Sequence, residues 1–165
     1  MRLLLMVVLA AVSTACASTG AAPRPFPTPG APRSAPELVG GTTAAPSELV
    51  GTALALRGIP YRNGGADLEG FDCSGFVHYV FAQHGLGLPR TVAEQYEAGR
   101  KVDSRELQPG DLVFFRTSGG DASHVGIALG DDAFVHAPSS SGVVRVEMIS
   151  AQYWMSRFAG ARRVF

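Results

Sequence analysis

The stretch GFDCSGFVHYVF (residues 70–81) decides how the surrounding chain folds. Its apolar residues recur at i,i+4 spacing, as Phe76 does with Val80, which predicts a helix with one buried face over residues 73–84. Gly85 follows the last periodic position and suits a helix terminus. The stretch therefore predicts a core helix that begins at a cysteine.

Cys73 stands in the first turn of this helix. The unpaired N–H groups and the helix dipole at that end favour a thiolate, and Asp72 or Ser74 can cap the turn. The chain has two cysteines, and the other, Cys16, lies in a segment typical of an export signal. Because exported proteins normally pair their cysteines, the unpaired Cys73 indicates a reactive thiol, with a buried inert cysteine as the alternative.

Two further helices are predicted around this one. Residues 47–58 form a helix bounded by Ser47 as N-cap and Gly58 as C-cap, and Thr91 with Glu94 begins a short helix as a capping box. The chain beyond residue 106 has the composition or alternation of strands, in the segments LQPGDLVFF, HVGIALG, AFVHA, VVRVEMI and RFAGARRVF.

This order of elements predicts an α+β fold in which the N-terminal helices pack on a small antiparallel sheet. One domain over residues 47–165 accommodates all of these segments. Asp111 is interpreted as a turn and strand-entry residue, and Tyr153 and Trp154 as core residues of a short helix.

A catalytic thiol needs a base, and four histidines are candidates. His78 is rotated by about 140° from Cys73 around the helix, so it is interpreted as a surface or hydrogen-bonded helix residue. His84 lies at the helix C-terminus, where the dipole favours a histidine.

His124 and His136 occupy two strands at matching parity. His124 shares a face with Gly126 and Ala128, small residues that leave space for a helix to approach closely. A hairpin centred on Gly130 would place the two histidines directly opposite, with Cβ atoms roughly 4.5–5.5 Å apart. One imidazole would then orient the other.

Five segments follow one another along the chain: DCSGFV, LPRTVAEQ, LQPGDLVFF, HVGIALG and FVHAPSSSGVV. In this order they closely resemble the NlpC-type family of bacterial cell-wall cysteine peptidases, and the resemblance covers essentially all of residues 47–165. The resemblance implies a papain-like fold and a Cys-His-His triad that falls on Cys73, His124 and His136. It further implies a site role for Tyr61 in PYRNGG, whose hydroxyl would lie near the thiol and help hold an oxyanion.

The resemblance also implies the reaction, hydrolysis of amide bonds in peptidoglycan stem peptides or cross-links, without a metal or an organic cofactor. Arg90 is a candidate for binding a substrate carboxylate, or it pairs with Asp72 or Glu94. Ser74 either lines the substrate cleft or caps the helix.

Three alternatives stay open at this point. Cys73, His124 and His136 could ligate a catalytic zinc, although the strand register suggests no carboxylate beside the histidines. The domain could bind peptidoglycan without turnover, or it could transfer the acyl group to an amine instead of water. Each uses the same fold.

The N-terminus indicates export. Residues 1–15 have a positive charge, a short apolar run and small residues, the anatomy of a signal peptide. STAC resembles the bacterial lipoprotein signal, in which Cys16 becomes lipidated; cleavage near Ala15 or Ala17 by an ordinary signal peptidase is the alternative. Residues 16–46 are rich in proline and small polar residues and predict a disordered tether.

The predicted location is the periplasmic side of the envelope. The family rule for lipoprotein sorting favours the outer membrane, because Ala17 rather than aspartate follows the lipidated cysteine. The formal net charge is zero and no basic run exceeds the pair Arg162–Arg163, which excludes a nucleic-acid-binding surface. A monomer that acts on peptide stems is expected.

Overall fold

The computed structural model describes residues 45–165. The predicted signal peptide, Cys16 and nearly all of the predicted tether lie outside the described residues. Among residues 45–165, no helix combines the length and the apolar character needed to cross a bilayer. The helices and strands are α1 (Pro46–Ala55), β1 (Ala66–Asp67), β2 (Gly70–Phe71), α2 (Cys73–Gln83), α3 (Val92–Glu97), β3 (Arg100–Val102), the 3-10 turn η1 (Ser104–Glu106), β4 (Leu112–Phe115), β5 (His124–Gly130), β6 (Ala133–His136), β7 (Arg145–Met148), α4 (Gln152–Met155) and β8 (Phe158–Arg163).

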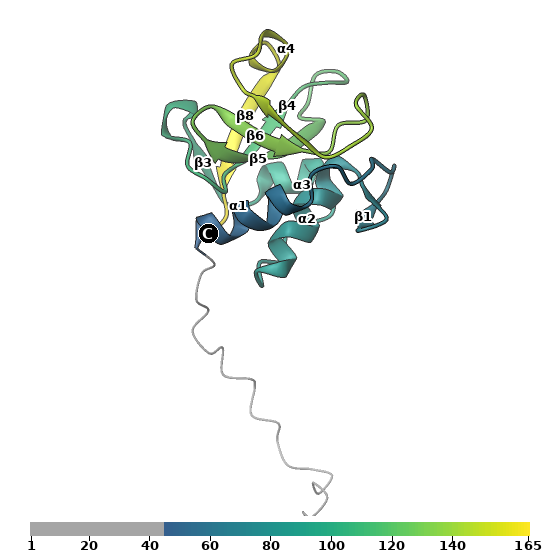
Figure 1. The fold of residues 1–165 in the computed structure, drawn as a ribbon. Coiled ribbons are helices and arrows are strands. Elements are labelled where there is room, and N and C mark those ends of the chain that lie inside the picture. Colours follow the sequence, from purple (N-terminus) through teal and green to yellow (C-terminus); the bar gives the residue numbers. More distant parts are fainter. Residues whose placement is uncertain (1–44) are drawn as a thin grey trace, which may run out of the picture. The chain divides into compact units, whose positions relative to one another are not determined.

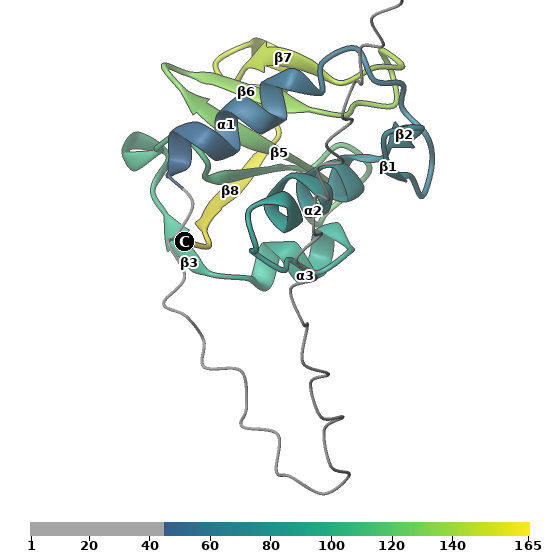
Figure 2. The same ribbon diagram turned by 60° about the horizontal axis from the view of Figure 1, so that its bottom comes forward.

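Six of the strands form one antiparallel sheet in the order β3-β8-β4-β5-β6-β7, and β1 pairs with β2 in a separate hairpin. Helices α1, α2 and α3 lie on one side of the sheet and α4 on the other (Figures 1 and 2). The prediction of an α+β fold with helices packed on a small antiparallel sheet is therefore confirmed.

Strand alternation gives the sheet two buried faces. Beneath the helices, Phe76 and Phe81 of α2 pack with Val125 of β5, and all three are fully buried. On the other face, Phe115 and Phe134 pack with Trp154 of α4, which closes that side. Each fully buried phenylalanine contributes roughly 1.5–3 kcal/mol to folding, so these clusters fix how α2 and α4 sit on the strands.

Three predictions about helix residues are wrong. Ser47 does not cap α1: Pro46 is the first helical residue and Ala45 is the N-cap, because a proline needs no hydrogen-bond acceptor there and its fixed φ suits the first turn. The helix ends at Ala55, so Gly58 belongs to the following turn. In α4, Trp154 is buried as predicted, but half of Tyr153 is exposed.

Two capping predictions are confirmed. The helix over Cys73–Gln83 ends at His84 as its C-cap, and Gly85 follows with φ +73°, in the left-handed region that a glycine adopts without strain. Thr91 and Glu94 form both hydrogen bonds of a capping box at the start of α3.

Candidate active site

The cysteine helix starts with a strong cap. Asp72 Oδ1 accepts a hydrogen bond from the Gly75 N–H at 2.7 Å, and the first intrahelical bond runs from the Phe76 N–H to the Asp72 carbonyl at 2.9 Å. The N–H groups of Cys73 and Ser74 precede that bond and have no partner among the hydrogen bonds of residues 45–165. The first turn of α2 therefore offers two N–H groups that no described oxygen accepts, beside a partly exposed thiol.

Two opposing influences act on the pKa of the Cys73 thiol. Burial, followed by the negative charge of Asp72, raises this pKa, whereas the N–H groups of Val125, Ser74 and Cys73 itself lower it. The N–H groups of the helix terminus thus favour a thiolate, in the predicted direction, but burial and the charge of Asp72 outweigh them and the pKa of the free thiol is raised. The thiol must pass its proton to a base. The Val125 N–H near the sulfur also places Cys73 beside the start of β5, one residue from His124.

Arg90 binds the N-terminus of α2. Its Nη1 donates to Asp72 Oδ1 and to Ser74 Oγ, both at 2.9 Å, and its Nη2 donates to Asp72 Oδ2 at 2.6 Å and to the Gly65 carbonyl at 3.2 Å. Of the two roles considered for Arg90, the structure shows the ion pair with Asp72. Binding of a substrate carboxylate by Arg90 stays a prediction, as does the cleft role of Ser74, which is 6% exposed.

This ion pair controls the charge of the cap. Burial alone would raise the pKa of Asp72, but the hydrogen bonds from Arg90 and Gly75 and the charge of Arg90 hold that pKa below its usual range. Asp72 is therefore ionised at neutral pH. Its carboxylate keeps the cap and the guanidinium in place, and with them the first turn that carries Cys73.

Gln95 supports the same turn and is absent from the sequence predictions. It is fully buried, and its Nε2 donates to the carbonyls of Ser74 at 3.0 Å and Pro89 at 2.8 Å. Its position in LPRTVAEQ, one residue after the capping-box Glu94, gave no indication of burial, because the short helix α3 has too few residues to reveal a periodic face.

The two strand histidines meet, but in a different register from the one predicted. The turn is centred on Asp131 and Asp132, with φ values of +47° and +67°, so Ala128 rather than Gly126 pairs with Phe134. The prediction that His124 and His136 stand directly opposite is therefore wrong. Aspartate tolerates left-handed backbone, which allows the turn to shift along the chain.

Gly126 makes this diagonal arrangement possible. A Cβ atom at Gly126 would lie 2.7 Å from a ring carbon of Phe134, 2.9 Å from the Val135 carbonyl oxygen and 3.1 Å from His136 Cβ. The space beside His124 is thus occupied by side chains of the neighbouring strand β6. A helix does lie on this face, since Trp154 of α4 stacks on His124, but the space at Gly126 itself is filled by β6.

The imidazoles form a direct hydrogen bond. His124 Nε2 and His136 Nδ1 are 2.7 Å apart, and the ring planes are nearly perpendicular. Burial lowers the pKa of His124 to about 4, and burial with the neighbouring charges of His124 and Arg145 lowers that of His136. Both rings are neutral at pH 7, so His124 can accept a proton, and its Nδ1 is the nitrogen left for that purpose.

Trp154 and Glu147 surround the histidine pair, and the sequence predictions assigned neither to the site. The indole of Trp154 stacks on His124 with ring centroids 5.3 Å apart, and its Nε1 donates a hydrogen bond to Glu147 Oε2. The face of a tryptophan favours a cation, so this stacking stabilises a protonated His124. The carboxylate corrects the expectation that none lies beside the histidines.

The other two histidines have structural roles, as predicted. His78 Nδ1 lies 2.7 Å from the Leu88 carbonyl oxygen, and His84 Nε2 lies 2.9 Å from Thr52 Oγ1. Asp111 likewise receives the Gln108 N–H of its turn, and it forms a buried ion pair with Arg163. None of them belongs to the candidate site.

Tyr61 lies close enough to the thiol for their charges to interact. Burial raises the pKa of its phenol most, followed by the charges of Cys73 and Asp72. The Tyr61 N–H donates to the Gly142 carbonyl at 2.7 Å, which anchors this part of the loop. The phenol therefore keeps its proton at neutral pH and remains a hydrogen-bond donor near the sulfur.

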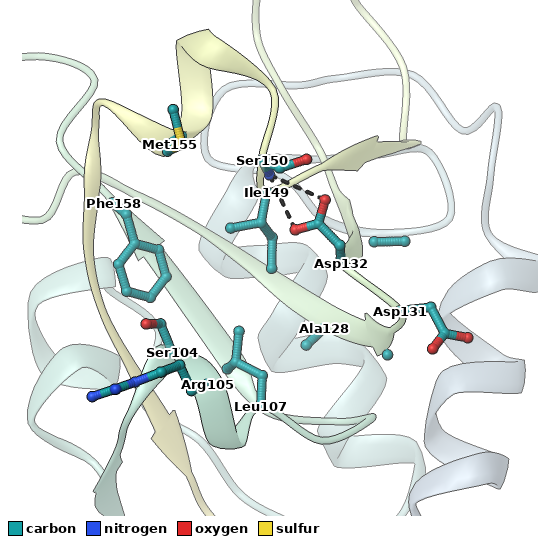
Figure 3. A pocket seen from close by; sticks show the side chains of 12 residues that line it. Ser104, Arg105, Leu107, Ala128, Asp131, Asp132, Ile149, Ser150, Met155 and Phe158 are labelled. Carbon is teal, nitrogen blue, oxygen red and sulfur yellow. Dashed lines mark hydrogen bonds between the residues drawn. The ribbon is translucent and has the colours of Figure 1, made fainter.

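A separate hollow lies elsewhere on the described part of the molecule. It measures about 510 Å³ and is lined by apolar residues such as Ala128, Met155 and Phe158, with Asp132 accepting a hydrogen bond from the Ser150 N–H at its rim (Figure 3). No cysteine or histidine lines it. This hollow is not the candidate active site, because it contains no nucleophile paired with a base.

More than half of the chain matches a known family model. The model of the NlpC/P60 family aligns with residues 58–163, a span that contains Cys73, both strand histidines and Tyr61. The chain belongs to the NlpC/P60 family. This result confirms the resemblance noted in the sequence and the papain-like fold that it implied.

Relatives of the NlpC/P60 protein include several enzymes. It is 48% identical over 109 residues to the murein DD-endopeptidase MepS/murein LD-carboxypeptidase of Escherichia coli K12, covering 66% of this chain and 57% of the relative. It is 37% identical over 123 residues to a gamma-D-glutamyl-L-lysine dipeptidyl-peptidase of Bacillus cereus, covering 73% and 37%. The chain thus spans about half the length of these curated relatives, or less.

Among solved structures, an NlpC/P60 family protein from Bacillus cereus superposes with a TM-score of 0.70 at 36% identity, covering 74% of this chain and 41% of that one. In the NlpC/P60 domain described here, no three histidine, cysteine or acidic side chains of residues 45–165 are grouped to hold a metal ion. His124 Nε2 and His136 Nδ1 are hydrogen-bonded to each other, so these two nitrogens do not act as ligands of the zinc ion considered as an alternative in the sequence.

Replacing Gly126 by alanine should destabilise the domain and separate the histidine pair. The new methyl group would collide with backbone of β6, and we expect the free energy of unfolding to fall by about 1–3 kcal/mol. Chemical denaturation measures this change. Gly51→Ala in α1 is the matched control, because no atom lies within 4 Å of its added Cβ and a helical alanine is neutral or stabilising. Equal stability of Gly126→Ala and the unmodified protein would contradict the account of the hairpin.

Proposed function

We propose that this NlpC/P60 protein hydrolyses amide bonds in the stem peptides or cross-links of peptidoglycan, with Cys73 as nucleophile, His124 as base and His136 as the residue that orients His124. One observation carries the proposal. A partly exposed thiol at a capped helix terminus adjoins the start of β5, where a neutral buried histidine is held by a second histidine at 2.7 Å.

The first step follows from the pKa values. Because burial raises the pKa of the Cys73 thiol and lowers that of His124, the resting pair is a neutral thiol and a neutral imidazole. As the sulfur attacks the peptide carbonyl carbon, His124 Nδ1 takes the thiol proton. The imidazolium that forms is stabilised by the His136 hydrogen bond and by the face of Trp154.

The negative charge that develops on the carbonyl oxygen needs donors. The free N–H groups of Cys73 and Ser74 are available in the first turn of α2, and the protonated phenol of Tyr61 is a third candidate. Donors of this kind contribute several kcal/mol to the lowering of a hydrolytic barrier.

Three proton transfers complete the cycle. His124 gives its proton to the leaving amine as the C–N bond breaks, leaving a thioester on Cys73. It then takes a proton from water as the water oxygen attacks the thioester carbon, and it returns that proton to the sulfur as the C–S bond breaks and the carboxylic acid product forms. All of these steps use side chains and backbone groups of the chain.

The choice of substrate rests on the relatives. Their names include a murein DD-endopeptidase, a murein LD-carboxypeptidase and a gamma-D-glutamyl-L-lysine dipeptidyl-peptidase, which all act on peptides containing D-amino acids. We propose a peptidoglycan stem or cross-link as the substrate of this chain. Binding of a stem carboxylate by the exposed part of Arg90, with Ser74 beside it, belongs to this proposal.

Digestion of isolated sacculi tests this function. Liquid chromatography and mass spectrometry of the soluble products should show muropeptides whose masses identify the broken amide bond. Adding a free amine distinguishes hydrolysis from acyl transfer, because transfer would yield an amide of that amine. Intact sacculi with no released or trimmed peptide after prolonged digestion would contradict the proposal.

We further propose an exported, monomeric lipoprotein that faces the periplasm from the outer membrane. The export-signal anatomy of residues 1–15 and the STAC segment support this location. Two or more acyl chains on Cys16 would anchor the protein stably, which a single chain does not achieve.

Replacing Cys16 by alanine should move the protein from the membrane fraction to the soluble fraction, because the acyl chains that hold it are absent. Immunoblots of fractionated cells measure the distribution. Cys73→Ala is the control, since it removes the other cysteine and should leave the protein in the membrane. Unchanged membrane retention of Cys16→Ala would rule out the lipid anchor.

A further inference from the structure

His136 has a buried nitrogen without a hydrogen bond. Its side chain is fully buried, its Nδ1 faces His124, and its Nε2 has no partner among the described residues. The nearest opposite charge is Glu147 Oε2, at 3.9 Å from that nitrogen. A buried polar atom without a hydrogen bond lowers the stability of the fold, so a buried nitrogen normally has a partner. The position of this carboxylate indicates which group attracts the proton of His136 Nε2.

Glu147 is held firmly in this place. On β7 it pairs across the sheet with Phe134, and Arg145 pairs with His136, so both charged residues share the face of the histidine. Arg145 forms an ion pair with Glu147, with Nε and Oε1 3.0 Å apart, and Trp154 Nε1 donates a hydrogen bond to Oε2. The oxygen that faces His136 is thus the one fixed by the tryptophan.

The position of one proton on each ring decides whether His124 can act as a base. To take the thiol proton at Nδ1, neutral His124 must carry its own proton on Nε2 and donate it to His136 Nδ1. His136 must then be unprotonated at Nδ1 and protonated at Nε2. In the opposite arrangement His136 donates from Nδ1, and His124 carries a proton on the nitrogen that should accept one.

We propose that Glu147 is a positioning residue which selects the productive tautomers of both histidines by attracting the proton of His136 to Nε2. This inference rests on the proposed function, because it concerns the same Cys-His-His site. Glu147 has no hydrogen bond or ion pair with Cys73 or His124 among the described residues, so this selection is exerted through His136.

The groups around His136 support this assignment. Charged or titratable side chains face it from β5 (His124) and from β7 (Arg145 and Glu147), and Trp154 of α4 packs edge-on at 4.9 Å between ring centroids. Arg145 repels a second proton on His136, whereas Glu147 offers an acceptor for the first. The pair therefore favours a neutral ring with its proton on the side of Glu147.

Tautomers are read directly by nitrogen NMR of the full-length protein with ¹⁵N-labelled histidine and the Cys73→Ala substitution, which needs no turnover. We expect His124 and His136 to carry their protons on Nε2. In Glu147→Gln, which has nearly the same shape but no charge, we expect a measurable population with the proton on Nδ1 of both rings. Glu48→Gln, an exposed change on α1, is the matched control and should leave the tautomers unchanged. Identical tautomers with and without the Glu147 charge would overturn the inference.

Kinetics of the same variants in the Cys73 background complete the test. We expect Glu147→Gln to lower kcat by at least about 10-fold with KM nearly unchanged, because orientation of the base is lost and substrate contacts are not. A purely structural role would instead lower the unfolding temperature without shifting the tautomers. If Cys73→Ala retains activity, the proposed function fails, but the NMR spectra still decide whether Glu147 selects the tautomers. A normal kcat in Glu147→Gln overturns the positioning role.

Discussion

Cys73→Ala should abolish turnover of peptidoglycan, with a loss of at least about 10⁴-fold. The sulfur is the only protein atom in the proposed mechanism that bonds to the acyl carbon of the substrate, so neither the histidine pair nor the N–H groups of the first turn can replace it. Release of muropeptides from sacculi, followed by mass spectrometry, measures the effect.

The control for this substitution is the fold. The Asp72 cap, the Arg90 ion pair and the buried face of α2 do not use the thiol, so Cys73→Ala should unfold at nearly the temperature of the unmodified protein. Wild-type rates of muropeptide release from a folded Cys73→Ala protein would exclude the thiol mechanism. Cys73→Ser retains the size of the side chain but replaces the nucleophile, and it should be comparably inactive.

His124→Ala should lower kcat by at least about 10³-fold, because the thiol, whose pKa is raised by burial, then has no base for its proton. His78→Ala is the matched control, since that histidine only bonds the Leu88 carbonyl. Substrate binding should change little in His124→Ala, so the loss should fall on kcat rather than KM. A His124→Ala protein that loses no more activity than His78→Ala would contradict its role as base.

The pH dependence of kcat/KM gives a second view of His124. Burial lowers its pKa to about 4, and the base is competent only while neutral. Activity should therefore persist as the pH falls through 6.5, the ordinary range of a histidine, and decline only as it approaches about 4. An acid limb near 6.5 or above would contradict the lowered pKa of His124.

Much of the fold can be predicted from local patterns. The apolar i,i+4 pairs locate α2, and the capping box locates α3, because these signals lie within one element. The strands β4 to β8 have clear composition or alternation. By contrast, β3 (Arg100–Val102) is short, with two exposed charged residues, and it is a strand only because it pairs with β8 at the edge of the sheet.

In the site, too, local patterns predict some features, whereas others depend on how the strands pair. Parity correctly places His124 and His136 on one face, but the register depends on where the turn forms, and Asp131 and Asp132 accept the left-handed backbone that moves it beyond Gly130. Glu147 is missed for a related reason. The alternation of VVRVEMI puts Arg145 and Glu147 on one face, yet only the pairing of β7 with β6 brings that face to the histidines.

In the proposed mechanism the sulfur of Cys73 carries the acyl group of the substrate during turnover. Rapid mixing with soluble cross-linked muropeptides, an acid quench and intact-protein mass spectrometry detect such an acyl-enzyme. We expect a transient mass increase equal to one acyl fragment, mapped to the peptide that contains Cys73 and absent from Cys73→Ala. Turnover at the normal rate by an enzyme whose Cys73 is unmodified at every time point would contradict it.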